Sequence, residues 1–425
     1  MASSTTPRPR KTLAVIGGGP IGLEVAVAAR TLDWQVVLFE KGEVAAHVRS
    51  WGQARLFSPF SMNRSDAGAS LLKASGHALP KDDAYITAEE YRTSYLLPMA
   101  QHAILRSVVR TGETVVAIAR SGFIKKDLAP ARAAAPFRLL VRTTEGVERV
   151  ETADVVVDAS GTYSRPNALG AGGMPCPGEA AASDRIARGL CDVLGRERMA
   201  FAGKRVLLVG GGHTAATSAI ALATLAEAAP GTRVVWVTRA QRSPLFPARA
   251  ADPLAERRAL EEAANRIAGG GTPHVAWRGG LEVVEIAPEP DGSALRVRLA
   301  GAGGEADEVV DQILANVGFG PDNSIYKELQ VHECYATLGP MKLSAAVLGA
   351  GSSDCVTQST HGLDSLVNPE PGFFILGAKS YGRNPNFLLR VGIEQVRDLF
   401  RILTGDAALD VTTAPRAPAT RGEDG

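Results

Sequence analysis

Two glycine clusters in the chain have the spacing that holds the phosphates of a dinucleotide. In the first, Gly17, Gly19 and Gly22 stand between the apolar run TLAVI and an alanine-rich segment. The first glycine of such a turn lets the chain bend, the second lets the backbone approach a pyrophosphate, and the third lets helix and strand pack closely. Pro20 and Ile21 then open a predicted helix, whose free amides favour an anion. The cluster therefore predicts a phosphate-binding turn.

The second cluster, GGGHTA, has the same order of residue types. Gly210 and Gly212 hold the first two glycine positions, and Ala215 holds the third, where alanine is an accepted variant. His213 and Thr214 are the first residues of the predicted helix and lie near the expected pyrophosphate. For either cluster alone, a purely structural strand-to-helix turn is the alternative.

The strand after each cluster suggests which nucleotide is bound. The run QVVLFE ends at Glu40, about 20 positions after the first turn, where an acid holds the ribose hydroxyls of a dinucleotide. After the second cluster, RVVWVT is followed by Arg239, with Arg242 beyond it. Basic groups at this point suit a 2′-phosphate and favour NADPH over NADH. A solvated surface charge is the alternative interpretation of Arg239.

The composition limits the classes of function. The chain has 425 residues with 45% hydrophobic and 21% charged residues, typical of a globular protein of two or three domains. A net charge of +1 argues against nucleic-acid or membrane-surface binding, and no apolar run reaches the ~20 residues that span a bilayer. No His, Asp, Glu or Cys spacing indicates a metal site. We expect a cytoplasmic protein.

The four cysteines do not form a redox pair. They are too far apart in sequence for the C-x-x-C pattern of disulfide reductases. We expect buried, inert thiols, and Cys355 is the one whose reactivity most merits a test.

The order of elements is repeated. After each turn come a second strand, a region of meander strands (113–151 and 279–301) and an apolar strand that exits through a glycine. A return segment, 369–403, adds a strand at FFIL and an amphipathic helix. The chain thus predicts an α/β fold with two Rossmann-like dinucleotide-binding domains, the second inserted in the first. The first domain comprises residues 1–165 and 335–410, the second comprises 166–334, and 411–425 form a flexible tail.

The motifs together resemble the two-dinucleotide-binding-domain flavoproteins, whose first domain holds FAD and whose inserted domain holds NAD(P)H. They are the two glycine clusters, Glu40, DASGTYSRP, ANVGFGPD and FFILGA. Within that superfamily the chain is most similar to the class B flavin monooxygenases, which include flavin-containing monooxygenases and N-hydroxylases. A long polar excursion after the first turn, a helical stretch at 87–103 and the missing cysteine pair carry this similarity.

The resemblance implies further site residues. It places Gly161, Gly377, Asn386 and Phe387 at the FAD, and gives Asn63 a catalytic role beside the reactive edge of the flavin. We also expect a helix to begin in NPNF, capped by Asn384 or Asn386 with Pro385 in its first turn, so that its amides stabilise negative charge on the flavin. An ordinary capped helix without a ligand is the alternative.

Two departures from the family pattern affect the expected reaction. The stretch between Arg165 and Phe201 lacks the phenylalanine–glycine–histidine–aromatic signature of these monooxygenases, and Ala378 replaces the aspartate of the Gly-Asp pair found in many flavin reductases. The leading expectation is an NADPH-using monooxygenase, in which reduced FAD captures O2 as a C4a-(hydro)peroxide and oxygenates a small molecule. The alternatives are an FAD-dependent NAD(P)H dehydrogenase or reductase of a small acceptor, and a nucleotide-binding redox sensor without turnover.

Overall fold

The computed structural model describes residues 11–248, 252–349 and 360–413, which form two compact units. Unit 1 is the described part of Met1–Arg49, Pro59–Ser164 and Pro321–Gly425, and unit 2 comprises Ser50–Ser58 and Arg165–Gly320. Segment 50–58 thus groups with unit 2, and the return to unit 1 begins at Pro321 rather than at residue 335. The assignment of FAD and NADPH to separate domains stays a prediction.

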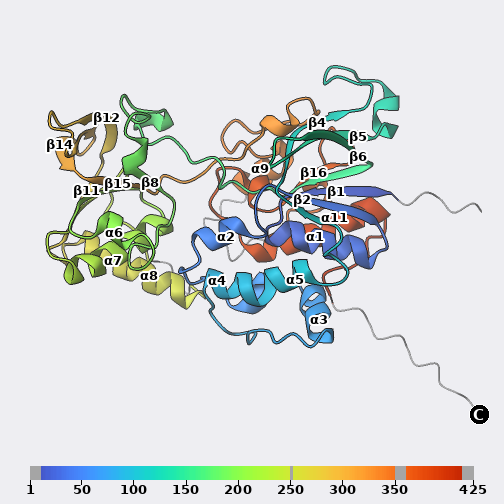
Figure 1. Ribbon diagram of the computed structural model, residues 1–425, viewed down its shortest axis with the longest axis horizontal. Helices are drawn as coiled ribbons and strands as arrows, with labels where there is room; N and C mark the ends of the chain where they lie inside the picture. The colour runs from blue at the N-terminus through green and yellow to red at the C-terminus, as the bar shows by residue number, and fades with distance from the viewer. Residues whose placement is uncertain (1–10, 249–251, 350–359, 414–425) are drawn as a thin grey trace, which may run out of the picture. The chain divides into compact units, whose positions relative to one another are not determined.

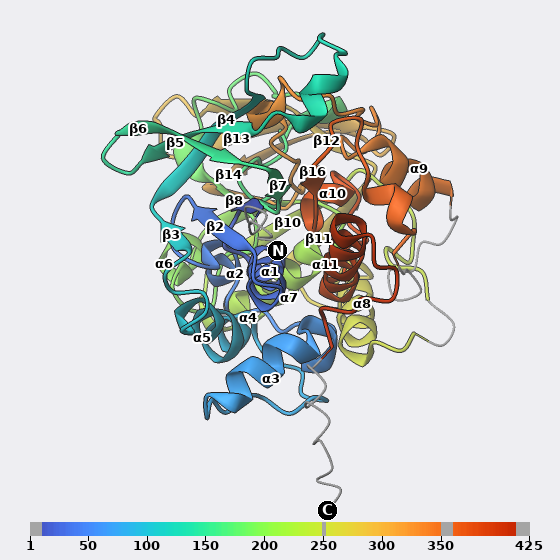
Figure 2. The same ribbon diagram turned by 90° about the vertical axis from the view of Figure 1, so that its right-hand side faces the viewer.

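Unit 1 is built on a parallel sheet covered on both faces. The sheet has the order β16-β7-β1-β2-β3, with β1 (Thr12–Ile16), β2 (Gln35–Glu40), β3 (Val109–Thr111), β7 (Val155–Asp158) and β16 (Phe373–Ile375). Helices α1 (Pro20–Thr31) and α11 (Leu389–Thr404) lie side by side along it (Figure 2). An antiparallel meander of β4 (Glu113–Arg120), β5 (Phe137–Thr143) and β6 (Glu148–Ala153) lies across the sheet from α1 (Figure 1).

The alternation of side chains in β1 explains why both faces are covered. Ala14 and Ile16 pack with the meander residues Ile118 and Phe137 in one core cluster. Because neighbouring side chains of a strand point to opposite faces, Val15 points the other way, toward α1. A strand buried on both faces needs the continuous apolar run that the sequence shows.

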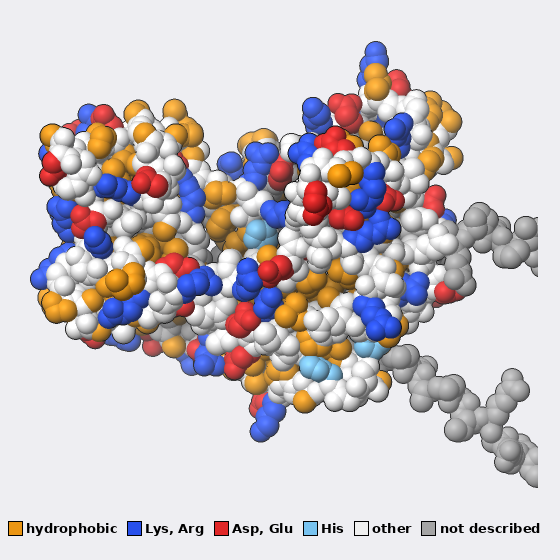
Figure 3. Space-filling model, viewed as in Figure 1, with side chains coloured by type: hydrophobic (Ala, Val, Ile, Leu, Met, Phe, Trp, Pro, Cys, Tyr) orange, Lys and Arg blue, Asp and Glu red, His pale blue; other side chains and the backbone are white. Residues whose placement is uncertain are grey.

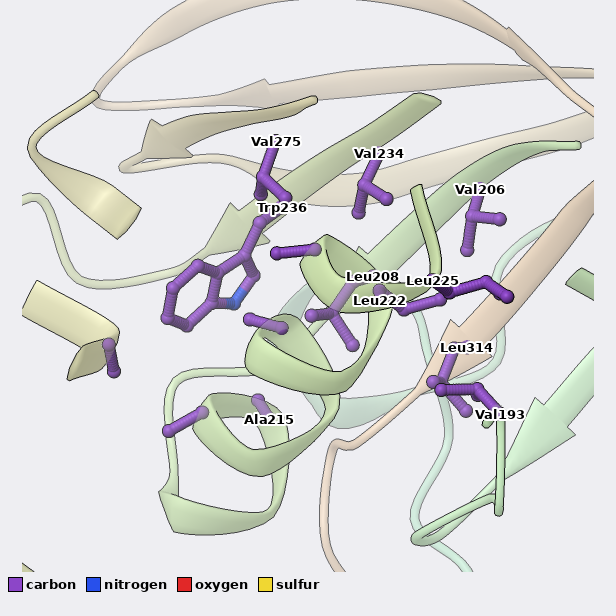
Figure 4. Packing of buried hydrophobic residues seen from close by; sticks show 14 of the residues in the cluster. Val193, Val206, Leu208, Ala215, Leu222, Leu225, Val234, Trp236, Val275 and Leu314 are labelled. Atoms are coloured by element: carbon purple, nitrogen blue, oxygen red, sulfur yellow. The ribbon is translucent and has the colours of Figure 1, made fainter. Parts of the chain in front are cut away.

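Unit 2 repeats this architecture. Its parallel sheet has the order β11-β10-β9-β15-β8, with β8 (Ile186–Arg188), β9 (Arg205–Val209), β10 (Arg233–Thr238), β11 (Val275–Gly279) and β15 (Gln312–Ala315). Helices α7 (His213–Ala228) and α8 (Ala255–Ala268) contribute to one core cluster, and the meander of β12 (Glu282–Pro288), β13 (Leu295–Gly301) and β14 (Gly304–Val310) contributes to another. In the first cluster Trp236 lies among Leu208, Leu222 and Val234 (Figure 4). The predicted α/β fold with two Rossmann-like units is confirmed.

The fifth strand distinguishes the two sheets. In unit 1 the position beside β7 is filled by β16 from the return segment, whereas in unit 2 the position beside β15 is filled by β8, which precedes the glycine turn in sequence. The two sheets therefore have equivalent strand positions, but the fifth strand comes late in the sequence of unit 1 and early in that of unit 2.

The remaining helices lie between these elements. They are α2 (Ala46–Ser50), α3 (Asp66–Ala74), α4 (Ala88–Tyr91), α5 (Leu97–Gln101), α6 (Arg198–Phe201), α9 (Met341–Gly349) and α10 (Ala378–Tyr381). The helical stretch predicted at 87–103 is confirmed, with a π-helical turn at Arg92–Leu96 between α4 and α5.

The predicted start of the last helix is wrong. Helix α11 begins at Leu389 with Leu388 as its N-cap, so Asn384, Pro385 and Asn386 precede the helix. The Asn384 side-chain oxygen instead accepts a hydrogen bond from the Asn386 backbone N–H at 3.0 Å. This local turn occupies the amide that a helix start would have presented.

The surface agrees with the near-neutral charge of the chain. On the face shown in Figure 3, Lys and Arg side chains are interspersed with Asp and Glu side chains. Among the described residues no helix has the length and hydropathy needed to cross a membrane.

Candidate cofactor-binding site

The first glycine turn has distinct steric demands at its three glycines. Gly17 has φ +104°, and a Cβ there would lie 2.6 Å from the Ala159 carbonyl oxygen. A Cβ on Gly22 would lie 1.9 Å from the Gly17 carbonyl oxygen. A Cβ on Gly19, by contrast, would have no described atom within 4 Å. The space beside the second glycine is therefore open, as an approaching pyrophosphate requires.

The start of α1 is suited to an anion. Gly19 is the N-cap, no described side chain caps the helix, and its first turn contains no acid. The Glu40 carboxylate accepts hydrogen bonds from Gly18 N at 2.7 Å and Gly42 N at 2.9 Å. These bonds hold the carboxylate at the end of β2 while leaving further lone pairs for ribose hydroxyls.

The second glycine turn repeats this geometry in unit 2. Gly210 has φ +146°, and a Cβ there would lie 2.3 Å from the Asn316 carbonyl oxygen, whereas a Cβ on Gly212 would meet no described atom within 4 Å. Ala215 is fully buried, and no described side chain caps α7, which begins at His213. The Trp236 indole donates a hydrogen bond to the Gly210 carbonyl oxygen at 2.8 Å. Each unit therefore presents one open turn, which we call the first and the second cradle.

Some side chains at the second cradle are held by contacts within the protein, and others are exposed. Thr238, at the end of β10, is buried, and its hydroxyl donates to Ala240 O at 2.8 Å. Arg239 and Thr214 are exposed. His213 Nε2 lies 2.8 Å from Glu261 Oε1, and its ring stacks on Phe246 at 5.4 Å between centroids. Of these groups, Arg239 is the exposed cation that could meet a phosphate.

The return segment of unit 1 contacts the beginning of α1. A Cβ on Gly377, which has φ +70°, would lie 3.2 Å from Ile21 Cγ1. A Cβ on Gly392 would lie 2.5 Å from Ile21 Cδ1 and 2.8 Å from Phe387 Cζ. The structure thus brings Gly377 and Phe387 to the beginning of α1, although Ile21 lies more than 350 residues before them in sequence. Asn386 is held in its turn with Asn384.

A buried ion pair beside the first cradle was missed by sequence reasoning. Lys379 Nζ lies 2.6 Å from Asp158 Oδ2 and donates to Ser160 Oγ at 3.1 Å and to Asp322 O at 2.8 Å. Both charged side chains are fully buried, and Asp158 Oδ1 accepts from the Ser160 hydroxyl at 2.7 Å. We call these four residues the Lys379 clamp. It fixes the β7 exit at Asp158 and Ser160, where Ala159 and Ser160 lie beside Gly17, and Gly161 (φ +72°) follows directly in sequence. A lysine within the apolar stretch FFILGAKSY was the available signal.

Asn63 is enclosed by protein. It ends a 3₁₀ turn at Phe60–Asn63 and is 2% exposed. Its side-chain amide donates to Pro59 O at 3.0 Å, and its carbonyl oxygen accepts from the Tyr91 hydroxyl at 2.6 Å. The structure therefore shows Asn63 fixing its own segment, and its catalytic role stays a prediction.

The cysteines differ in their environments. Burial raises the pKa of Cys176 and of Cys191 to about 11, with a further contribution from a neighbouring glutamate in each case, which agrees with inert thiols. Cys334 departs from that expectation, because a hydrogen bond from the Thr337 backbone lowers its pKa. Cys355 lies outside the described residues. Within the described ranges, no group of three or more His, Cys, Asp or Glu side chains could hold a metal ion.

Comparisons with known proteins agree with this geometry. The family model described as pyridine nucleotide-disulphide oxidoreductase matches residues 14–340, more than half of the chain, so the chain belongs to that family. No curated protein has a significantly similar sequence. The fold is similar to that of the bacillithiol disulfide reductase from Bacillus cereus (18% identity over 93% of this chain and 99% of that chain, TM-score 0.64).

Two solved hydroxylating flavoproteins are equally similar in fold. The FAD-bound cadaverine monooxygenase from Erwinia amylovora has 14% identity over 97% of this chain and 98% of that chain, with a TM-score of 0.65. The ornithine hydroxylase from Pseudomonas aeruginosa has 18% identity over 93% and 99%, with a TM-score of 0.63. The chain is accordingly an FAD-dependent, pyridine-nucleotide-using oxidoreductase with a fold similar to class B flavin monooxygenases.

Proposed function

We propose that the protein is an NADPH-dependent flavoprotein monooxygenase that oxygenates a small molecule with O2. The observation that carries the proposal is the pair of open cradles of equal geometry, one in each unit. Two cradles imply two dinucleotides, and hydride transfer between nicotinamide and flavin is the chemistry that such a pair supports.

In this proposal each cradle binds its cofactor mainly with backbone groups. The amides at the start of α1, open around Gly19, bind the FAD pyrophosphate, and Glu40 holds the adenosine ribose. The amides at the start of α7, open around Gly212, bind the NADPH pyrophosphate, and Arg239 binds the 2′-phosphate. His213 stays bound to Glu261 and fixes the first turn of α7.

The return segment closes the first cradle. Gly377 lies beside Ile21, Gly392 lies beside both Ile21 and Phe387, and the Lys379 clamp holds the β7 exit, which Gly161 follows in sequence, beside Gly17. Bound FAD supplies the hydride acceptance and the reaction with oxygen, so these residues need only bind, orient and exclude water.

The cysteines support oxygenation over disulfide reduction. The sequence has no C-x-x-C pair, and burial raises the pKa of Cys176 and Cys191 to about 11. Cys334, whose pKa is lowered, has no second cysteine at redox-pair spacing in the sequence. Small amines and sulfur compounds are the proposed substrates. The amines are supported by the similar fold of a cadaverine monooxygenase and an ornithine hydroxylase.

The stoichiometry of turnover tests the proposal. Purified protein loaded with FAD is supplied with NADPH, O2 and a panel of diamines, amino acids and thioethers, and oxygenated product is compared with hydrogen peroxide. We expect one product formed per NADPH consumed for at least one substrate class. Peroxide alone across the panel would refute oxygenation.

A second candidate is an NAD(P)H-dependent reductase of a small acceptor. The family assignment and the similarity in fold to a bacillithiol disulfide reductase favour it. Undiminished anaerobic turnover with a quinone or a low-molecular-weight disulfide, with no need for O2, would establish this candidate instead.

A further inference from the structure

Glu24 is a buried carboxylate that the proposed chemistry does not use. It lies on α1, four residues after Pro20, and is 4% exposed. Its Oε1 accepts hydrogen bonds from the Tyr95 hydroxyl at 2.6 Å and from Ser65 N at 3.1 Å. Its Oε2 accepts from the Ser65 hydroxyl at 2.7 Å. One carboxylate therefore receives three donors from two segments distant in sequence.

A buried carboxyl group at this position is costly. The neighbours of Glu24 on α1, Leu23 and Val25, are fully buried apolar residues, so α1 itself has no need of an acid here. Burial raises the pKa of Glu24, and the hydrogen bonds from Tyr95 and Ser65 offset part of that rise. Because burial of the Glu24 carboxyl group costs stability, we look for its role in the segments that it binds.

Glu24 binds Ser65 and Tyr95, which belong to two segments that meet at Asn63. Ser65 is the N-cap of α3 and directly follows the segment 59–64, while Tyr95 lies in the π-helical turn between α4 and α5. The rings of Tyr95 and Tyr91 stack at 5.8 Å between centroids, and the Tyr91 hydroxyl donates to Asn63 O at 2.6 Å. Segment 59–65 is thus attached to α1 at Ser65 and to the end of α4 at Asn63.

The packing leaves little freedom for this network to shift. A Cβ on Gly68 would lie 2.2 Å from the Tyr95 hydroxyl oxygen, so only glycine fits there. Phe60, at the other end of the segment, packs edge-on against the Tyr95 ring at 5.7 Å between centroids. Tyr95 therefore contacts one end of the segment through the Phe60 ring and is linked to the other end, at Ser65, through Glu24.

We propose that Glu24 is a positioning residue that fixes segment 59–65, and with it Asn63, against the helix that opens at the first cradle. The effect of Glu24 on bound FAD rests on the proposed function, in which the first two turns of α1 bind the FAD phosphates and also anchor this segment. The structural part of the proposal, the fixing of segment 59–65, holds whether or not flavin is bound.

Two variants test the network, and a third serves as a control. Glu24→Gln keeps the shape of the side chain, but it removes the negative charge and replaces one of the two acceptor oxygens by a donor NH2 group. Tyr91→Phe removes the hydroxyl that holds Asn63 and leaves Glu24 intact. The matched control is Thr87→Ala, which removes the capping box of α4, where Thr87 Oγ1 accepts from Glu90 N at 3.1 Å, without touching Glu24 or Ser65.

Hydrogen exchange of the full chain measures the fixing directly. In Glu24→Gln the Ser65 amide should exchange on the order of tenfold faster, because it loses a charged acceptor. In Tyr91→Phe the protection around Asn63 should fall, and in Thr87→Ala both should keep their protection. Unchanged exchange in Glu24→Gln, or equal loosening in the control, would overturn the proposal.

The flavin provides the second measurement, made on the protein loaded with FAD. Visible circular dichroism reports how the ring is held, so we expect Glu24→Gln to alter the spectrum of bound FAD and Thr87→Ala to leave it unchanged. An unchanged spectrum in Glu24→Gln would refute the link from Glu24 to the flavin. Failure of the unaltered protein to bind FAD would instead refute the proposed function, and the exchange results would still decide the role of Glu24.

Discussion

Replacing Lys379 by methionine should strongly destabilise unit 1. The Asp158 carboxylate would keep the Ser160 N–H at 3.1 Å and the Ser160 hydroxyl at 2.7 Å, but it would lose the ammonium group 2.6 Å away. The Asp322 carbonyl oxygen would also lose its donor. Leaving one charge of a buried pair without its partner costs about 3–5 kcal/mol of unfolding free energy.

Thermal unfolding of the flavin-free protein, followed by circular dichroism, measures this cost. For domains of roughly 150–250 residues each kcal/mol shifts Tm by about 2–4 °C. The expected loss for Lys379→Met is therefore about 6–20 °C.

The double variant Lys379→Met with Asp158→Asn is the control. It removes both charges, and the new amide oxygen can still accept from Ser160, so we expect most of the lost stability to return. A double variant as unstable as the single one would refute the interpretation that the cost is an unpaired buried carboxylate.

Four further substitutions have separate expected outcomes. Gly17→Ala should destabilise the fold, because its φ is +104° and its Cβ would meet Ala159, whereas Gly19→Ala should keep the Tm and weaken FAD binding at least tenfold by titration. Arg239→Ala should raise the KM for NADPH on the order of tenfold and leave that for NADH unchanged; equal effects on both would refute its phosphate contact. Burial raises the pKa of Glu370, but hydrogen bonds from Arg132 and Arg120 outweigh it and lower the net pKa below 4.5. A lowered pKa adds stability above pH 4.5 that is lost as the pH falls toward the folded-state value, so Glu370→Gln should flatten this acid limb in unfolding measured against pH.

The glycine turns could be predicted because their requirements are local. Gly17 and Gly210 need positive φ, and both meet the backbone of the strand exit that follows the meander. Strand, turn and helix are contiguous in sequence, so the residue types alone specify them. The same reasoning applies to β1, whose continuous apolar run reflects burial on both faces.

The features that sequence reasoning missed depend on distant partners. Lys379 and Asp158 are 221 positions apart, and nothing local pairs a lysine in one strand exit with an aspartate in another. The helix start was misplaced because Asn384 satisfies an amide two residues on, a local alternative that a capping pattern does not distinguish from a helix N-terminus. Strand β8 joins its sheet from before the glycine turn, an order that the repeat in the sequence did not reveal.

The two cradles share their backbone geometry, so the choice of cofactor has to come from the side chains around them. At the first, Glu40 is held at the end of β2 by two backbone amides, and a fixed carboxylate accepts ribose hydroxyls but repels a 2′-phosphate. At the second, the residue at the end of β10 is Thr238, whose hydroxyl is already used, and the next side chain is the exposed Arg239. In the proposed function, charge therefore disfavours NADPH at the first cradle and favours it at the second. Exchanging the two residue types, with Glu40→Arg and Arg239→Glu, should weaken the binding of both cofactors rather than swap them, because the return segment closes around Ile21 in unit 1.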